Sequence, residues 1–315
     1  MRRRPVIWIA VILFGVFVYD AVVRSLLAGL VTLPSIPGGL KVLTAVLALF
    51  SLTHSWYSIG GRLTAAFFVL SAAIAWAYEQ VGVMTGVVFG AYHYTDYLGA
   101  RLGEVPLLIP LAWFMMIYPS YVIANIALEG RPIGTPSGAR VLVRLAAVSA
   151  AVMTAWDLVI DPILSGPSVK AWIWETGGPY FGIPIQNFLG WLLTTFTVYL
   201  AYRAVEQRWA AGGPSDAGGG AVAGGPSDAG GGAVADGAGD AGGGAGDAGG
   251  GAGDLSPATA ALPVAAYGLM LVANLLSGVA PAGLVVIGPL VMGVPLAAVA
   301  WRATRGGQSA GPRRR

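Results

Sequence analysis

The chain has 315 residues, of which 56% are hydrophobic and only 10% are charged, and its mean hydropathy is +0.71. Because a water-soluble domain carries about 25% charged residues, this composition excludes an ordinary soluble domain and predicts a polytopic membrane protein. The absence of cysteine excludes disulfides, thiolate metal sites and thiol nucleophiles, and the net charge of +3 gives no indication of nucleic-acid binding.

Eight apolar segments approach or reach the roughly 20 residues that a helix needs to cross a bilayer. They cover approximately residues 6–30, 41–59, 62–80, 105–128, 140–160, 184–203, 258–278 and 281–301. The first has the basic start of a signal peptide but no evident cleavage site, so we expect a retained helix. The last two are also compatible with a shallow hairpin. The predicted fold class is all-α, a transmembrane helical bundle of about eight spans.

The basic residues predict the orientation of this bundle, because Lys and Arg accumulate in cytoplasmic loops. With a cytoplasmic N-terminus, fourteen arginines fall on the cytoplasmic side, and only Lys41, Arg101 and Lys170 fall on the other. The carboxyl groups of the motif regions sort the opposite way. We therefore expect a multi-pass protein of the cell membrane, with its acidic clusters near the outer interface.

Four regions are expected along the chain. Residues 1–206 form a membrane domain, 207–256 a cytoplasmic linker, 257–302 a transmembrane hairpin and 303–315 a basic tail. The linker contains GGPSDAGGGAVA twice in tandem, at 212–223 and 224–235, followed by GDAGGGA repeats. Without large apolar side chains it cannot bury a core, so we expect a flexible coil with no chemistry.

The first candidate site region covers residues 77–116. Glu79 is expected in the last turn of the third span, and the glycines that follow it weaken helical structure. The run YHYTDY then combines tyrosines with His93 and Asp96. One interpretation is a solvated loop with an interfacial aromatic belt. However, irregular backbone is tolerated at membrane depth where it lines an enclosed cavity, so we predict a functional cavity.

The second candidate site region covers residues 155–191. Asp157 and Asp161 are four residues apart and share one helix face, and Pro162 is expected to end that helix. An intramembrane Asp costs about 2.5–3.5 kcal/mol on insertion scales and is a functional candidate by default, although Asp161 alone could simply lie at the interface. Asn187 is either a helix-packing residue or a substrate or water ligand. The surrounding residues are Trp172, Trp174, Glu175, Tyr180, Phe181 and Trp191.

Neither histidine predicts a metal site. His54 stands alone and is expected to be a packing residue, and His93 lacks the spacing of metal ligands. No glycine-rich phosphate-binding loop is present either. A bound metal or nucleotide is therefore unsupported.

The two regions together offer carboxyl groups among Trp and Tyr side chains. Neighbouring buried carboxyl groups divide into a proton donor and an ionised partner, and aromatic faces stabilise a nearby cation. This chemistry suits protonation of an alkene in an apolar substrate. It suits proton-coupled transport equally well, so the residues alone leave both open.

A family resemblance favours the enzyme. The run EQVGVMTGVVFGAYHYTDYLGARLGEVPLLIPLAWFMMIYPSY, followed by WDLVIDP and by WIWETGGPYFGIPIQNFLGW, resembles the carotenoid 1,2-hydratases of the bisanhydrobacterioruberin hydratase type, over roughly residues 75–203. The flanking spans match only in hydropathy. The resemblance implies a cofactor-independent hydro-lyase that adds water across the C1–C2 double bond of an acyclic carotenoid end group. The implied substrate is bisanhydrobacterioruberin or a lycopene-like carotenoid.

Roles for individual residues follow from chemistry rather than from the family. Asp157 or Asp161, and next Asp96, would protonate C2. Tyr94, Trp174 and Tyr180 would shield the cation at C1. Glu79 or Glu175, together with Asn187, would hold the attacking water. The other predicted substrate-binding residues are Tyr92, His93, Trp172 and Phe181.

The expected partners are the carotenoid within the bilayer, the lipid membrane and other membrane enzymes of the carotenoid pathway, without nucleic acid. Several alternatives stay open. A cyclase would use the same proton donor but exclude water, and a proton-coupled transporter or a binding protein would need no reaction at all. A prenyltransferase is disfavoured because, outside the Gly-rich linker, the chain has one Asp-x3-Asp and no second motif to hold a magnesium-bound diphosphate.

Overall fold

The structure is a computed structural model that describes residues 4–211 and 255–308. These residues form an all-α bundle with eight helices long and apolar enough to cross a membrane, which confirms the predicted fold class. The helices are α1 (Arg4–Phe17), continued by the π-helical η1 (Val18–Val23) and α2 (Arg24–Leu27), then α3 (Gly39–Ile59), α4 (Gly61–Thr85), α5 (Leu108–Glu129), α6 (Ala139–Leu164), α7 (Ile185–Ala211), α8 (Pro257–Leu276) and α9 (Leu284–Gln308).

Short strands lie in two of the loops. The α4–α5 loop contains β1 (Tyr92–Tyr94), the 3-10 turn η2 (Asp96–Leu98), β2 (Arg101–Leu102) and β3 (Val105–Pro106), and the α6–α7 loop contains β4 (Trp172–Trp174). β2 pairs with β3 as a small hairpin, whereas β1 pairs antiparallel with β4. The β1–β4 pair therefore joins the two regions that the sequence singled out.

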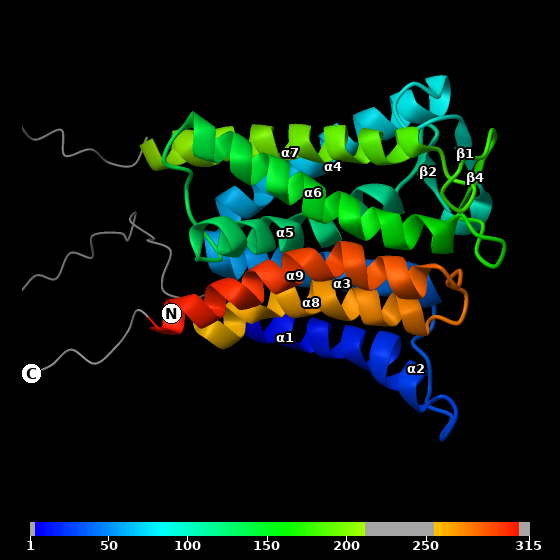
Figure 1. Ribbon diagram of the computed structural model, residues 1–315, viewed down its shortest axis with the longest axis horizontal. Helices are drawn as coiled ribbons and strands as arrows, with labels where there is room; N and C mark the ends of the chain where they lie inside the picture. The colour runs from blue at the N-terminus through cyan, green and yellow to red at the C-terminus, as the bar shows by residue number, and fades with distance from the viewer. Residues whose placement is uncertain (1–3, 212–254, 309–315) are drawn as a thin grey trace, which may run out of the picture.

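The helices run along the long axis of the molecule in alternating directions (Figure 1). α5 is the central helix and packs against α3, α4, α6, α8 and α9. The β1–β4 pair and α2 lie at one end of the bundle, here called the strand end. The start of α1 and the last turns of α9 lie at the opposite, terminal end. The cytoplasmic assignment of the terminal end stays a prediction.

Some expected boundaries shift. α7 continues to Ala211, so residues 207–211 of the expected linker are helical. The tandem repeats at 212–235 and the rest of the segment up to residue 254 lie outside the described residues, as does most of the basic tail. α6 continues past Pro162 to Leu164, although the sequence predicted that this proline ends the helix.

Three helix-interior prolines tie separate elements together. Proline leaves the carbonyl four residues earlier without its helical hydrogen bond, and a bilayer offers no water to satisfy it. In each case a side chain from another element donates to that carbonyl. The bonds are Ser51 Oγ to Met115 O (2.8 Å, opposite Pro119), the Tyr180 hydroxyl to Leu158 O (2.8 Å, opposite Pro162) and His54 Nε2 to Thr259 O (2.9 Å, opposite Pro263).

A buried ion pair within α7 is hydrogen-bonded to α5. Arg203 lies inside the bundle and donates to Glu206 Oε2 (3.0 Å) and to Asn125 Oδ1 (2.7 Å). Its guanidinium lies 4.0 Å from the ring centre of Tyr121, and the Tyr121 hydroxyl donates to Glu206 Oε1 (2.6 Å). Arg203 is therefore paired inside the bundle and does not lie in a loop. The membrane orientation predicted from loop charges depends on the other arginines.

Phe89 fixes the entry into β1. Its ring lies between two helix glycines: a Cβ placed on Gly82 of α4 would come within 2.5 Å of the ring, and one on Gly190 of α7 within 2.6 Å. Small residues let membrane helices and loops approach this closely. β1 begins at Tyr92, only three residues after Phe89. The packing of the Phe89 ring between the two glycines therefore helps to set where β1 lies.

We expect Gly190→Ala to destabilise the protein by about 1–3 kcal/mol, the usual cost of overpacking. The added methyl group would also meet the Val88 carbonyl oxygen at 2.5 Å, and this backbone atom cannot turn aside. Thermal unfolding in detergent measures the loss. Gly15→Ala in α1 is the matched control, because no atom lies within 4 Å of the new Cβ. Equal unfolding temperatures for the two variants would contradict the packing role of Gly190.

Candidate functional site

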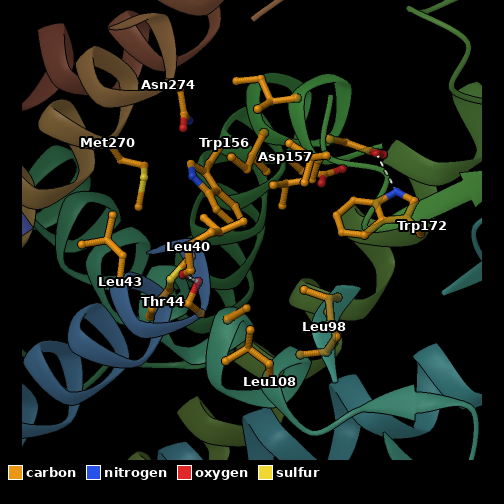
Figure 2. Close-up of a pocket in the computed structure, with 18 of the residues that line it drawn as sticks. Leu40, Leu43, Thr44, Leu98, Leu108, Trp156, Asp157, Trp172, Met270 and Asn274 are labelled. Atoms are coloured by element: carbon orange, nitrogen blue, oxygen red, sulfur yellow. Dashed lines mark hydrogen bonds between the residues drawn. The ribbon is translucent and has the colours of Figure 1, made fainter. Parts of the chain in front are cut away.

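A cavity of about 370 Å³ lies in the part of the bundle toward the strand end. Leucine, isoleucine and methionine side chains from α3, α5, α6 and α8 form part of its apolar wall, and Figure 2 shows several of them around the open space. Polar residues from α4, α6, α7 and the β1–β4 pair lie together in this lining, and the Asp20–Arg24 ion pair (3.2 Å) of η1 and α2 also belongs to it. The cavity is therefore mostly apolar with a small number of polar groups, as is typical of small-molecule sites.

The β1–β4 register decides which motif residues face this cavity. Tyr92 pairs with Trp174 and Tyr94 with Trp172, while the intervening pair is His93 with Ile173. Because successive side chains of a strand point to opposite faces, the two tyrosines and two tryptophans line the cavity. His93 points away from it and is hydrogen-bonded to Glu175 on the exposed face.

Glu79 is buried beside this strand pair and accepts three hydrogen bonds. The Tyr92 and Tyr94 hydroxyls donate to Oε2, the latter at 2.8 Å, and the Trp113 indole donates to Oε1 at 3.1 Å. Burial, and next the negative charge of Glu79, raise the pKa values of both tyrosines well above their ordinary range. The hydroxyls therefore keep their protons and act as donors to the carboxylate.

Asp161 is equally buried and also accepts three hydrogen bonds. The indoles of Trp172 and Trp174 donate to Oδ1 at 2.9 and 3.3 Å, and the Asn187 amide donates to Oδ2 at 2.8 Å. The dashed line at Trp172 in Figure 2 marks the hydrogen bond that its indole donates. Three donors around one carboxyl group are the arrangement that stabilises its charged form.

Asp157 lies one helical turn away and is supported differently. Asn187 Nδ2 donates to its Oδ2 at 3.0 Å, so this one amide bridges the two aspartates. Oδ1 has no hydrogen-bond partner among the described residues, although it is buried. Four buried carboxyl groups line the cavity, those of Asp20, Glu79, Asp157 and Asp161. Asp20 accepts from Arg24 and from the Ile36 backbone N–H, so Asp157 has the fewest donors of the four. Asn187, whose role the sequence left open, acts here as a bridge between α6 and α7.

The structure separates the predicted site residues into two groups. Those that line the cavity are Glu79, Tyr92, Tyr94, Asp157, Asp161, Trp172, Trp174 and Asn187. Those that do not are His93, Asp96, Glu175, Tyr180 and Phe181. Asp96 is exposed and paired with Arg101 (3.2 Å), and Glu175 lies on the outer face with His93. The expectation of one chamber thus holds for three of the five acids.

Tyr180 and Phe181 lie in the loop that follows β4. The Tyr180 hydroxyl is engaged with the Leu158 carbonyl, and burial raises its pKa to about 12, so it remains a donor. Phe181 is 41% exposed and contacts the α8–α9 connection near Gly283. Both residues support the loop rather than the cavity wall.

Several cavity residues were not singled out from the sequence. Trp113 holds Glu79 and stacks on Trp191 at a ring distance of 4.0 Å, and Trp156 contacts Trp191 edge-on at 6.0 Å. Met270 and Asn274 bring α8 into the wall. Only Asn274 offered a signal, as a lone amide in the apolar run LMLVANLL.

The described residues contain no group of three or more His, Cys, Asp or Glu side chains that could hold a metal ion. The polar groups of the cavity are carboxyl, phenol, indole and amide groups. They can donate and accept protons and can stabilise positive charge, which is the equipment for acid–base chemistry on an apolar ligand.

Two comparisons with known proteins both point to carotenoid biosynthesis. A family model described as "Carotenoid biosynthesis protein" matches residues 40–215. The chain is also 34% identical over 125 residues to a protein of Haloarcula japonica named "Bisanhydrobacterioruberin hydratase". That alignment covers 39% of this chain and 39% of the relative, well short of its full length. No solved structure matches the chain.

Proposed function

Because the chain belongs to the carotenoid biosynthesis protein family, we propose that it is a hydratase that adds water across the C1–C2 double bond of an acyclic carotenoid end group. The name of the Haloarcula relative supports hydration as the reaction. Bisanhydrobacterioruberin or a lycopene-like carotenoid is the proposed substrate. The observation that carries the proposal is that the three buried carboxyl groups of the motif regions, Glu79, Asp157 and Asp161, line one apolar cavity with unequal hydrogen-bond support.

The size of the cavity suits one end of a carotenoid. Its volume of about 370 Å³ is at the lower end of the roughly 300–1,000 Å³ typical of small-molecule pockets. An end group fits such a space, whereas the long polyene does not and would extend into the bilayer. Apolar burial of the end group supplies binding energy and keeps bulk water away from the reacting carbons.

Asp157 is the proposed proton donor. Glu79 and Asp161 each accept three hydrogen bonds, which stabilise their ionised forms, whereas Asp157 accepts one and leaves Oδ1 without a partner. A third negative charge beside Asp161 would be costly in this surrounding. A proton on Oδ1 of Asp157 avoids that cost and is free to move to C2 of the substrate.

Protonation at C2 leaves a tertiary cation at C1. The negative charges of Glu79 and Asp161 and the faces of Tyr92, Tyr94 and Trp174 stabilise it. Water then forms a bond to C1 through its oxygen and gives up one proton to Asp157, which is restored for the next cycle. Glu79 Oε1 accepts only the hydrogen bond from Trp113, so its second lone pair is available to accept a hydrogen bond from this water. The cycle adds one water and needs no cofactor.

Pigment analysis tests the reaction. Expressed in a host that makes an acyclic carotenoid, the protein should yield a pigment heavier by the mass of one water for each hydrated end group. Purified protein with the carotenoid alone, without nucleotide or metal, should give the same product. A product of unchanged mass but altered structure would identify a cyclase instead. Unchanged pigment in both experiments would overturn the proposal and favour a transporter or a binding protein.

The location of the reaction is also a proposal. The chain is a multi-pass membrane protein by its eight apolar helices and its family. If the terminal end is cytoplasmic, as the arginines predict, the cavity lies toward the outer interface. A carotenoid that spans the cell membrane would then present one end group directly to it.

A further inference from the structure

Three indole rings form one continuous layer in the wall of the cavity. Trp113 on α5 is stacked on Trp191 on α7, with the ring centres 4.0 Å apart and the ring planes 10° apart. Trp156 on α6 contacts Trp191 edge-on at 6.0 Å. All three residues line the cavity. The reaction proposed above gives no role to Trp191, although an aromatic pair of this kind is stabilised beyond the effect of its buried area.

One member of this layer is hydrogen-bonded to Glu79. Trp113 Nε1 donates to Glu79 Oε1 at 3.1 Å. The other two donors to this carboxyl group, the Tyr92 and Tyr94 hydroxyls, both bind Oε2. Trp113 is therefore the one donor among the described residues that binds the oxygen proposed to hold the attacking water. Trp191 forms no hydrogen bond with Glu79 in that part of the chain and can affect it only through Trp113.

The direction of the Trp113 N–H depends on the plane of its ring. An indole turns as a rigid plate about two side-chain torsions, and the outer torsion has a broad range. One hydrogen bond at the edge of the ring therefore does not fix its plane. Stacking on Trp191 does so, and the contact with Trp156 in turn holds Trp191. Side chains from α5, α6 and α7 thus act together on one oxygen of Glu79, which belongs to α4.

We propose that Trp191 is a positioning residue for water capture. Through its stack on Trp113 it fixes the direction of the hydrogen bond to Glu79, and with it the Oε1 lone pair that accepts the attacking water. This inference rests on the hydratase function proposed above and deepens it. With the water in place, its oxygen bonds to C1 and the hydrated product forms. With the water misplaced, the cation loses a proton from a methyl group on C1 to a nearby carboxylate. The electrons of that C–H bond form a new double bond at C1, and the product is an open-chain isomer of unchanged mass.

The ratio of this isomer to the hydrated product tests the role in purified variants supplied with lycopene. Trp113→Phe keeps a stacking ring but removes the N–H, and we expect the ratio to rise about tenfold, the effect of one hydrogen bond to a charged group. Trp191→Leu keeps the N–H but removes the stack, and should raise the ratio by about two- to tenfold. Trp191→Phe retains an aromatic face and should restore a ratio near that of the wild type. A general loss of structure lowers both products together and leaves the ratio unchanged.

Infrared spectroscopy reads the surroundings of Glu79 without turnover. Its band is identified as the carboxyl band that is lost in Glu79→Gln protein. We expect Trp191→Leu to shift this band, as Trp113→Phe does, and Trp191→Phe to return it. Trp209→Phe, an exposed tryptophan on the same helix as Trp191, is the matched control and should leave the band and the ratio unchanged. Size-exclusion chromatography checks folding, and Trp191→Met is a second variant without the stack if Trp191→Leu does not fold.

The outcomes separate the positioning role from the reaction. A Glu79 band that does not move when the stack is removed overturns the role, whatever the products are. A band that moves while the ratio stays constant also overturns it, because water capture would then not depend on Glu79. A shifted band with a raised ratio, both reversed in Trp191→Phe, supports it. If the wild type forms no hydrated product, the hydratase function falls and the role in water capture falls with it, while the band still shows whether Trp191 holds Glu79.

Discussion

Replacing Asp157 by asparagine should lower carotenoid hydration by at least about 100-fold, because general acid catalysis by a positioned group contributes about 10²–10⁴-fold. Asparagine keeps the shape and the contact with Asn187 but has no acidic proton to deliver to C2. The measurement is the rate of hydrated product formed by purified protein. Binding of the carotenoid should persist, since the apolar wall of the cavity is unchanged.

Asp96→Asn is the matched control for this experiment. The sequence also made Asp96 a candidate donor, but the structure places it on the surface beside Arg101. We expect this variant to hydrate at the wild-type rate. If Asp157→Asn gives undiminished hydrated product, Asp157 is removed from the mechanism. If Asp96→Asn is the inactive variant, the cavity is not where the proton is delivered.

Replacing Arg203 by methionine should destabilise the protein by about 3–5 kcal/mol, the cost of removing one partner of a buried ion pair. Met fills much of the space of the arginine, but Glu206 would keep a buried charge with only the Tyr121 hydroxyl to support it. Thermal unfolding in detergent measures the effect. Arg203 lies in the last turns of α7 toward the terminal end, away from the cavity, so the loss should appear in stability rather than in substrate affinity.

The double variant Arg203→Met with Glu206→Met separates charge from packing. Replacing both ions by apolar side chains of similar volume is often neutral or stabilising. We therefore expect the double variant to recover most of the stability that the single variant loses. If it is as unstable as Arg203→Met alone, the defect lies in the packing around Tyr121 and Asn125 and not in an uncompensated charge.

Hydropathy and local spacing determined a large part of this molecule. Each membrane span is encoded by its own apolar run, because a bilayer requires about 20 apolar residues wherever the helix packs. The spacing of Asp157 and Asp161 placed them on one helix face for the same local reason. The interpretation of His54 as a packing residue agrees with its place between Tyr118 and the Thr259 carbonyl.

Local signals could not decide which candidates share a site. His93, Asp96 and Glu175 look as suitable in sequence as Tyr92 and Asp161. The pairing of β1 with β4 turns alternate residues toward and away from the cavity, and that register depends on contacts between segments about eighty residues apart. Asp96 falls in a 3-10 turn after β1 and is carried to the surface. The local sequence therefore predicts neither the β1–β4 register nor the exposure of Asp96.

The sequence by itself thus determined the all-α membrane architecture, the two motif regions and the acid pair on α6. Only the tertiary structure decided that Glu79 joins that pair, that Asp157 has the fewest hydrogen-bond donors of the three, and that α8 closes the cavity with Asn274. The physical reason is the sequence range over which the deciding interactions act. Span formation depends on neighbouring residues in a uniform apolar solvent, whereas the support around a carboxyl group depends on donors that come from α5, α7, β1 and β4.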